Sequence, residues 1–176
     1  MFDTIVAATD GSAPAEKAVR LAGQLAAAHS AELILAHIID PQMSRDELRH
    51  FAEAEHLASS YPARRGGEAL VMPHGEAPLP ATLGGEEVDW VAAEETVGRR
   101  VLEKAIEIAR AAGAQRIEAV VGHGEVANAI LEIADQRQAD ALVVGSHGRG
   151  GLMDPVFGSV SRRVAQGAKT TCVTVT

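Results

Sequence analysis

The residue types best suited to chemistry gather near the C-terminal end of the chain. Gly145, Gly148, Gly158 and Ser159 follow the spacing Gly-x2-Gly-x9-Gly-Ser between an apolar run and a helical pattern. Glycines let a backbone come close to a ligand, and the amides at a helix N-terminus are directed donors for phosphate oxygens. Residues 141–176 also hold four basic side chains against one acidic one in a chain of net charge −8 (Arg149, Arg162, Arg163 and Lys169 against Asp154). The pattern predicts a site for an anionic, phosphate-bearing ligand.

Two familiar phosphate motifs do not occur in the sequence. Gly-x-x-x-x-Gly-Lys-Ser/Thr is absent, and Gly148 and Gly150 lack the third glycine of a dinucleotide fingerprint because residue 153 is methionine. The end of the third expected strand reads Val120-Val121-Gly122-His123, without the aspartate that accepts phosphate in a phosphorelay receiver. These absences argue against a P-loop NTPase, a typical dehydrogenase and a receiver domain.

Other reactive side chains give weaker signals. Asp10 lies in an Asp-Gly-Ser turn, where it either contacts a ligand or serves only the turn. His147 lies inside the glycine-rich loop without a nucleophile or carboxylate at a recognisable spacing, so we expect no catalytic role for it. The single cysteine, Cys172, is expected to be a small buried apolar residue. The acidic residues within 86–95 favour a helix start over a metal cluster.

Apolar runs and helical repeats alternate along the chain. Runs of strand length occur at 4–8, 32–39, 116–121, 140–144 and 172–175, and helical spacing occurs over 18–26, 97–112, 126–134 and 158–166. Ser12 and Pro14 suit the start of the first helix, and Gly113 suits the end of a later one. Continuous apolar runs are typical of strands covered on both faces. The predicted fold class is α/β, a Rossmann-like, doubly wound five-stranded parallel sheet with strand order 3-2-1-4-5.

This topology indicates where a ligand would bind. In a doubly wound sheet, ligands lie beyond the carboxyl ends of the strands, at the point where the strand order reverses. With strand 4 on the far side of strand 1, that point falls between Asp10 and Gly145. The glycine-rich loop leaves strand 4 there, so the topology and the motif predict the same place.

Residues 41–90 depart from the alternation. Ser44 to Glu47 form a capping-box signature for one modest helix. Residues 61–90 then contain nine prolines and glycines in thirty positions, which is typical of a long loop. We expect a single domain over 1–176 with an insertion or long mobile loop at about 41–90, and we expect residues 61–90 to be the first cut in limited proteolysis.

The composition of the chain limits the classes of partner that we expect it to bind. Apolar residues make up 47% of the 176 residues, aromatic residues only 3%, and the net charge is −8. The scarcity of aromatic residues and the acidic balance argue against nucleic-acid and membrane partners. One cysteine forms no intrachain disulfide, and the first residues lack the pattern of an export signal. We expect a cytoplasmic protein.

The spaced glycines resemble the nucleotide-binding members of the universal stress protein family. Gly145, Gly148, Gly158 and Ser159 fill that family's Gly-x2-Gly-x9-Gly-Ser/Thr pattern. The resemblance extends to Asp10-Gly11-Ser12, to His37-Ile38-Ile39-Asp40 and to Gly124-Glu125, over roughly residues 1–40 and 91–176. It departs from the family at residues 41–90, which exceed the usual connection, and at Thr170-Thr171-Cys172, where the family often places a proline.

The resemblance implies an adenine nucleotide site in a fold like that of the adenine nucleotide alpha hydrolases. ATP is the expected cofactor, with magnesium, ADP and AMP left open. By carry-over, Asp10 faces the nucleoside and Ile38 the adenine, Gly145 and Gly148 admit the phosphates, and Ser159 donates to them. Gly158 belongs to the same site. The other implied lining residues are Ala8, Val144, Ser146, Arg149, Val160 and Ser161.

Three functions stay open at this stage. The first is a nucleotide-responsive regulatory module of the stress response that binds ATP without efficient turnover. The second is a weak ATPase or autophosphorylating enzyme with Ser159 or Ser161 as acceptor, and the third is a nucleotide-free protein-interaction scaffold. The C-terminal strand also predicts a homodimer, because an uncovered edge invites pairing with a second copy. A proline at Val173 or Val175 is expected to weaken that pairing.

Overall fold

A computed structural model describes residues 1–40, 90–148 and 158–176. The expected helix after Ser44, nearly all of the insertion at 41–90 and the site residue Arg149 lie outside these ranges. The chain divides into two compact units, one made of Met1–Pro41 with Gly98–Thr176 and the other of Gln42–Val97. The sheet and the candidate site both belong to the first unit.

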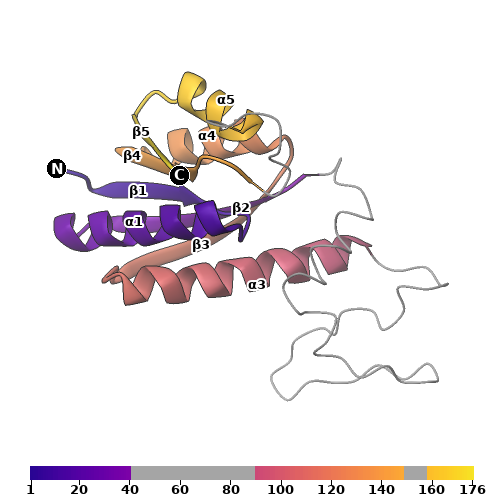
Figure 1. Cartoon of the computed structure of the whole chain (residues 1–176), viewed down its shortest axis with the longest axis horizontal. Helices are drawn as coiled ribbons and strands as arrows, with labels where there is room; N and C mark the ends of the chain where they lie inside the picture. Colours follow the sequence, from indigo (N-terminus) through magenta and orange to yellow (C-terminus); the bar gives the residue numbers. More distant parts are fainter. Residues whose placement is uncertain (41–89, 149–157) are drawn as a thin grey trace, which may run out of the picture. The chain divides into compact units, whose positions relative to one another are not determined.

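Five parallel strands form one sheet in the order β3-β2-β1-β4-β5. They are β1 (Thr4–Ala8), β2 (Glu32–Ile39), β3 (Arg116–His123), β4 (Ala141–Gly145) and β5 (Thr171–Val175) (Figure 1). This is the predicted doubly wound fold with the predicted strand order. β3 and β5 are the edge strands, which explains why residues 116–121 alternate between apolar and polar types before the run becomes apolar.

Four helices connect the strands in the described part of the chain, namely α1 (Ala13–His29), α3 (Trp90–Ala111), α4 (Val126–Gln136) and α5 (Ser159–Gly167). Ser12 caps α1 as predicted, because its Oγ accepts from the amide of Ala15 at 3.4 Å. Gly113 has φ +104°, the conformation that suits glycine just beyond a helix end. Helix α3 begins at Trp90. This start lies inside the acidic stretch at 86–95 and before the first clear apolar repeat at Val97.

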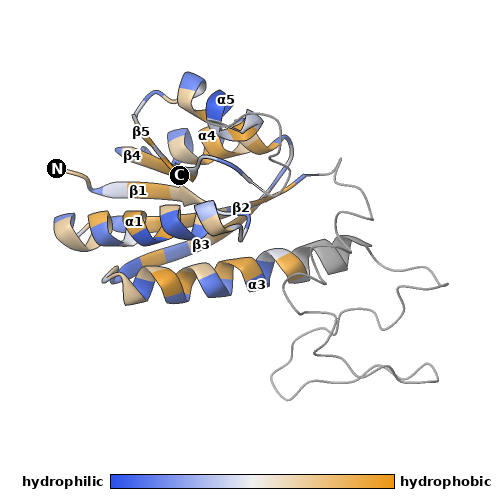
Figure 2. Ribbon diagram, in the orientation of Figure 1, coloured by the Kyte–Doolittle hydropathy of each residue, from blue (hydrophilic) through white to orange (hydrophobic). Residues whose placement is uncertain are grey.

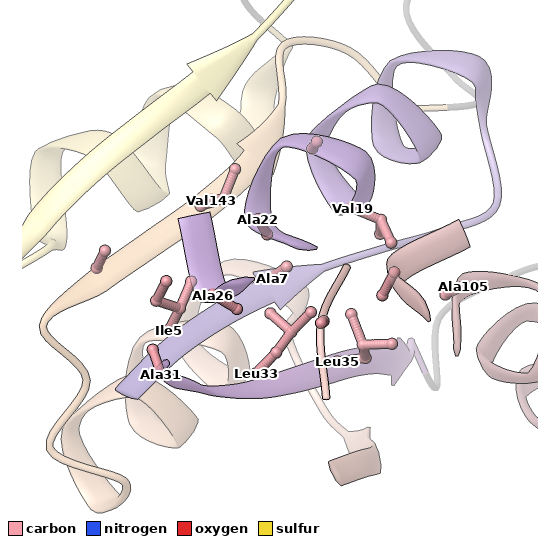
Figure 3. Close-up of a cluster of buried hydrophobic side chains, with 14 of the residues drawn as sticks. Ile5, Ala7, Val19, Ala22, Ala26, Ala31, Leu33, Leu35, Ala105 and Val143 are labelled. Carbon is pink, nitrogen blue, oxygen red and sulfur yellow. The ribbon is translucent and has the colours of Figure 1, made fainter. Parts of the chain in front are cut away.

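Alternate residues of the strands pack on opposite sides of the sheet. Ile5, Leu33 and Leu35 face α1 and α3 within one apolar cluster (Figure 3). Ile34 and Leu142 belong to a second cluster with α4 and α5. Figure 2 shows the apolar inner strand β2 of the sheet and helices whose surfaces alternate between apolar and polar. Fully burying one such side chain stabilises the fold by about 1.5–3 kcal/mol, so the two clusters hold the strands that carry the site.

Small residues allow one of the helix pairs to approach closely. A Cβ atom on Gly23 of α1 would lie 2.9 Å from the carbonyl oxygen of Ala109 in α3. Many of the helix positions that pack against the sheet are also alanine (Ala18, Ala22, Ala26, Ala105 and Ala109). The scarcity of aromatic residues therefore matches a core built on short side chains, with close contact between its layers.

Candidate functional site

Hydrogen bonds within the turn and to β2 hold the turn between β1 and α1. The amide of Thr9 donates to the carbonyl of Ala36 at 2.9 Å, and Thr9 Oγ1 accepts from the amide of Gly11 at 3.2 Å. Asp10 Oδ1 accepts from the amide of Ser12 at 3.0 Å. Gly11 has φ +79°, which a residue with a side chain adopts at a cost. The turn therefore presents Asp10 in a defined orientation at the carboxyl end of β1.

Ser146 fastens the loop between β4 and α5. Its amide donates to the carbonyl of Val175 at 2.6 Å, and its own carbonyl accepts from the amide of Gly158 at 2.7 Å. The Ser161 hydroxyl also donates to that carbonyl at 2.7 Å. Ser146 is only 1% exposed, so these contacts lie away from water. The first residue after β4 is thus tied to the end of β5 and to the start of α5.

The two loops meet at their glycines. A Cβ atom on Gly148 would lie 2.7 Å from Asp10 Oδ2, and one on Gly145 would lie 2.9 Å from the amide nitrogen of Ala15. Neither glycine has a positive φ, so each is needed for space and not for its backbone conformation. The structure therefore brings Asp10 and Gly148 together at the point where the strand order reverses, as the topology predicted.

Helix α5 begins differently from α1 and α4. Ser12 closes the start of α1 with its hydroxyl, and Glu125 closes the start of α4 by accepting from the amides of Ala127 and Asn128 at 3.3 and 3.0 Å. Gly158 is the N-cap of α5 and makes no side-chain hydrogen bond there, and the first turn of α5 has no acidic residue. The first amides of a helix have no acceptor within the helix, and its dipole favours an anion there. The start of α5 can therefore receive an anionic group.

The charge around α5 is less positive than the sequence suggested. Arg163 forms an ion pair with Glu125 at 2.7 Å, and Lys169 forms one with Asp135 at 2.5 Å. Both carboxylates belong to α4 or its cap, outside the segment whose charges were counted. The expectation that four basic residues give this segment a local positive field is therefore wrong for two of them, because α4 supplies the compensating charges.

The remaining predicted site residues take several positions. Ala8, Ile38 and Val144 are buried in the cluster beneath α4 and α5, and Val160 is half-buried against the same cluster. Ser159 is exposed at the first turn of α5, whereas Ser161 is buried. Ile38 packs close to Gly122 on the neighbouring strand β3. A Cβ atom on Gly122 would lie 2.7 Å from Cδ1 of Ile38. The structure thus gathers Asp10, Ser146, Gly148, Gly158 and Ser161, while Ile38 lies on β2.

Sequence reasoning missed one buried contact at this edge. Nδ1 of His37 lies 2.9 Å from the carbonyl oxygen of Thr9, and both residues are buried. His37 appeared only as part of a family resemblance. A histidine inside an otherwise apolar strand was the available signal, because a buried imidazole requires a hydrogen-bond partner.

The remaining features concern metal ligands, membrane-spanning helices and the cysteine. The described residues contain no group of three or more metal-ligating side chains, and none of their helices is long and apolar enough to cross a membrane. Burial raises the pKa of the Cys172 thiol, which keeps it protonated at neutral pH. Cys172 packs against the cluster beneath α4 and α5 as an apolar side chain, but it is half-buried on the edge strand β5 and not buried as predicted.

Comparison with known proteins assigns the family. The model of the universal stress protein family matches residues 1–176. Universal stress protein YxiE of Bacillus subtilis is 31% identical over 169 residues, which cover 94% of this chain and 93% of that protein. A universal stress protein solved in complex with cAMP is 28% identical with a TM-score of 0.62, covering 99% of this chain and 96% of that one. Universal stress protein UspA from Lactobacillus plantarum shares the fold at 15% identity and a TM-score of 0.69, covering 100% and 99% of the two chains. The chain belongs to the universal stress protein family.

Proposed function

We propose that this protein binds an adenine nucleotide, with ATP as its principal ligand, and acts as a nucleotide-responsive regulatory module in the stress response. The observation that carries the proposal is that the Asp10 carboxylate lies beside Gly148 at the carboxyl edge of the sheet, in the space that a Cβ atom on Gly148 would need. In this arrangement Asp10 faces the nucleoside, and the phosphates lie against Gly145, Gly148 and the start of α5.

Two findings support the proposal. Within the part of the chain that the structure describes, the N-cap Gly158 gives the first amides of α5 no side-chain acceptor, so these amides can donate to phosphate oxygens. The relative that was solved in complex with cAMP is 28% identical to this chain over almost its whole length. Together they favour a phosphate-bearing adenine ligand over a nucleotide-free scaffold.

Titration calorimetry with ATP, ADP, AMP, cAMP and GTP tests this proposal. We expect the adenine nucleotides to bind and GTP to bind at least about tenfold more weakly, because a site that recognises one base leaves polar groups unpaired with another. Running the ATP titration with and without magnesium decides whether the metal takes part. Heats indistinguishable from dilution for every adenine nucleotide would reject the proposal in favour of the scaffold.

We further propose that ATP is bound without efficient turnover. Of the two hydroxyls considered as phosphate acceptors, that of Ser161 is buried and donates to the Ser146 carbonyl, so it is engaged in holding the loop. Ser159 is exposed and is the acceptor that remains for the enzymatic alternative. Steady phosphate release that the change Ser159→Ala or a loop mutation abolishes, and that a mock purification lacks, would favour the enzyme.

We also propose a cytoplasmic homodimer that pairs through β5, an edge strand of the sheet. The carbonyl of Val175 accepts from Ser146, so Val175 directs its backbone groups toward β4. Since the N–H and C=O of one strand residue point to the same side and those of the next residue to the other, Val173 also points inward. The expectation that a proline at Val173 or Val175 probes the outer edge is therefore wrong, and Thr174 is the suitable position.

The change Thr174→Pro should weaken dimerisation by roughly tenfold to a hundredfold, because each copy loses an outward donor worth about 0.5–1.5 kcal/mol. Light scattering during size exclusion measures the mass over a concentration series. The matched control is Thr174→Val, which keeps the amide and should remain dimeric. A parent protein that is monomeric at high micromolar concentration would reject the dimer.

We retain as a proposal that residues 1–176 form one domain with an insertion at about 41–90. The candidate site lies entirely in the unit of Met1–Pro41 and Gly98–Thr176. A chain in which a short linker replaces residues 61–88 should therefore fold and bind ATP like the parent. A replacement that unfolds, as followed by circular dichroism, would show that the segment belongs to the core.

A further inference from the structure

We infer that His37 is a positioning residue for the nucleotide, which acts through the Thr9 carbonyl to fix the Asp10 turn, and that Gly98 provides the space for its imidazole. This inference rests on the proposed function. It concerns two residues, on β2 and α3, that the phosphate motif does not contain.

The contact between His37 and Thr9 has a defined direction. Nδ1 of His37 lies 2.9 Å from the Thr9 carbonyl oxygen. Because a carbonyl oxygen only accepts, Nδ1 carries the hydrogen and donates it. The strand register places Ala8 beside Ala36, so the residues that follow them, Thr9 and His37, lie at the same edge of the sheet. His37 is 8% exposed and Thr9 is 7% exposed, which keeps water from replacing either partner.

This hydrogen bond completes the fixation of Thr9. The amide of Thr9 donates to the carbonyl of Ala36 at 2.9 Å, its hydroxyl accepts from Gly11 at 3.2 Å, and its carbonyl accepts from His37. All three groups of Thr9 are therefore engaged directly before Asp10. The orientation of the next peptide then determines where the Asp10 carboxylate lies relative to Gly148.

Gly98 lies where α3 passes the imidazole. A Cβ atom on Gly98 would lie 2.9 Å from Cδ2 of His37. Glycine is unfavourable in a helix interior, so its presence there indicates a need for space. Gly98 thus leaves room for the imidazole, the imidazole binds the Thr9 carbonyl, and Asp10 follows Thr9 in the chain and lies beside Gly148.

A histidine that served only core packing would have different consequences from a positioning residue. The loss of a packing residue lowers stability but adds independently to the effect of changing Asp10, whereas the loss of a positioning residue has no further effect once Asp10 is gone. A double-mutant cycle on ATP affinity therefore separates the two roles. The rescue variant is His37→Asn, whose side-chain amide can donate from about the position of Nδ1.

The experiment measures ATP binding by titration calorimetry for the parent, His37→Leu, Asp10→Ala and the double variant. We expect His37→Leu to weaken binding about tenfold in the parent and less than about twofold in Asp10→Ala, with His37→Asn close to the parent. Parent affinity in His37→Leu, equal losses in both backgrounds, or failure of His37→Asn to restore binding would each overturn the inference. If His37→Leu does not fold, Gly98→Ala serves in the same cycle, because it displaces the imidazole without removing it.

A nuclear magnetic resonance measurement on the ligand-free protein keeps the inference separate from the proposed function. His37→Leu should shift the amide resonances of Gly11 and Gly148, and His37→Asn should leave them near the parent positions. Unchanged resonances in His37→Leu would overturn the positioning contact even if ATP binds. A parent that binds no nucleotide but shows these shifts would reject the proposed function and the nucleotide role of His37, while confirming that His37 sets the turn.

Discussion

Asp140 lies directly before β4 at the amino edge of the sheet, and Asp10 lies just after β1 at the carboxyl edge. Their carboxylates have different partners. At the amino edge, Asp140 Oδ2 accepts from the amides of Asp3 and Thr4 at 2.7 and 3.0 Å, while the amide of Asp140 donates to the Thr4 carbonyl at 2.9 Å. At the carboxyl edge, Asp10 Oδ1 accepts from Ser12 and its Oδ2 lies beside the position where Gly148 lacks a side chain. Asp140 joins two strands, whereas Asp10 is directed at a loop.

This difference shows how one sheet separates stability from binding. Backbone donors hold the Asp140 carboxylate, so that carboxylate contributes to the fold. At the carboxyl edge, Thr9, His37 and Ser146 hold the backbone, and among the described residues the N-cap Gly158 offers the first amides of α5 no side-chain acceptor. A change to Asp10 or Gly148 at the carboxyl edge should therefore alter ligand affinity more than stability, and a change to Asp140 at the amino edge should do the opposite.

The largest expected effect is that of Gly148→Val on ATP affinity. A branched side chain would fill the space beside Asp10 and keep the phosphates from the loop backbone, and a loss of about 2.7 kcal/mol weakens binding about a hundredfold. Gly148 is exposed and has no positive φ, so the fold should tolerate the change. Titration calorimetry with a melting curve checks both statements. The control is Asp140→Asn, which should bind ATP like the parent, and undiminished affinity in Gly148→Val would place the site elsewhere.

The next effect separates two glycines of the same loop. A Cβ atom on Gly145 would meet the backbone of Pro14 and Ala15 at 2.9 Å, and backbone atoms in a packed helix move little. We expect Gly145→Ala to lower the free energy of unfolding by about 1–3 kcal/mol, the usual cost of overpacking. At about 2–4 °C per kcal/mol for a chain of this size, the melting temperature should fall measurably.

Gly148→Ala is the matched comparison for that variant. Among the described residues, its Cβ atom would meet the end of the Asp10 side chain, which yields more readily than the backbone atoms beside Gly145. The melting temperature should therefore stay near that of the parent while ATP affinity falls. If Gly145→Ala melts like the parent, the glycine motif does not combine a packing role with a binding role.

The sequence predicted the sheet because its strands are short runs, apolar in the centre and alternating in the edge strand β3, bounded by polar or turn residues. It predicted the strand order because alternating strands and helices are typical of a doubly wound sheet. It also predicted the Ser12 cap and the Gly113 stop, which depend on residues next to each other in the chain. The position of Asp10 beside Gly148 and the hydrogen bond of His37 with Thr9 were not predictable in the same way. They join residues far apart in the chain, and they depend on the register between parallel strands, which the sequence alone does not specify. The pairing of Arg163 with Glu125 was missed for the same reason, since α4 and α5 meet only in the folded protein.

The smallest expected effect is the pH dependence of the contribution from Asp140. The hydrogen bond from the Thr4 amide, and next that from the Asp3 amide, lower the pKa of Asp140 from its ordinary value of 3.8. A carboxyl group whose pKa is lower in the folded state stabilises the fold above its unfolded pKa, and this contribution is lost as the pH falls through the lower folded value. Asp140→Asn should therefore be less stable than the parent at pH 7 by an amount that stays constant down to about pH 4 and shrinks at lower pH.

Urea unfolding at pH 7, 5 and 3 measures the difference in the free energy of unfolding between Asp140→Asn and the parent. Asp3→Asn is the matched control, because it changes a carboxylate at the same edge and leaves both amide donors with the Asp140 acceptor. A difference between Asp140→Asn and the parent that grows toward acid would mean that the carboxylate does not join the strands, and the contrast between the two edges would fail at its amino end.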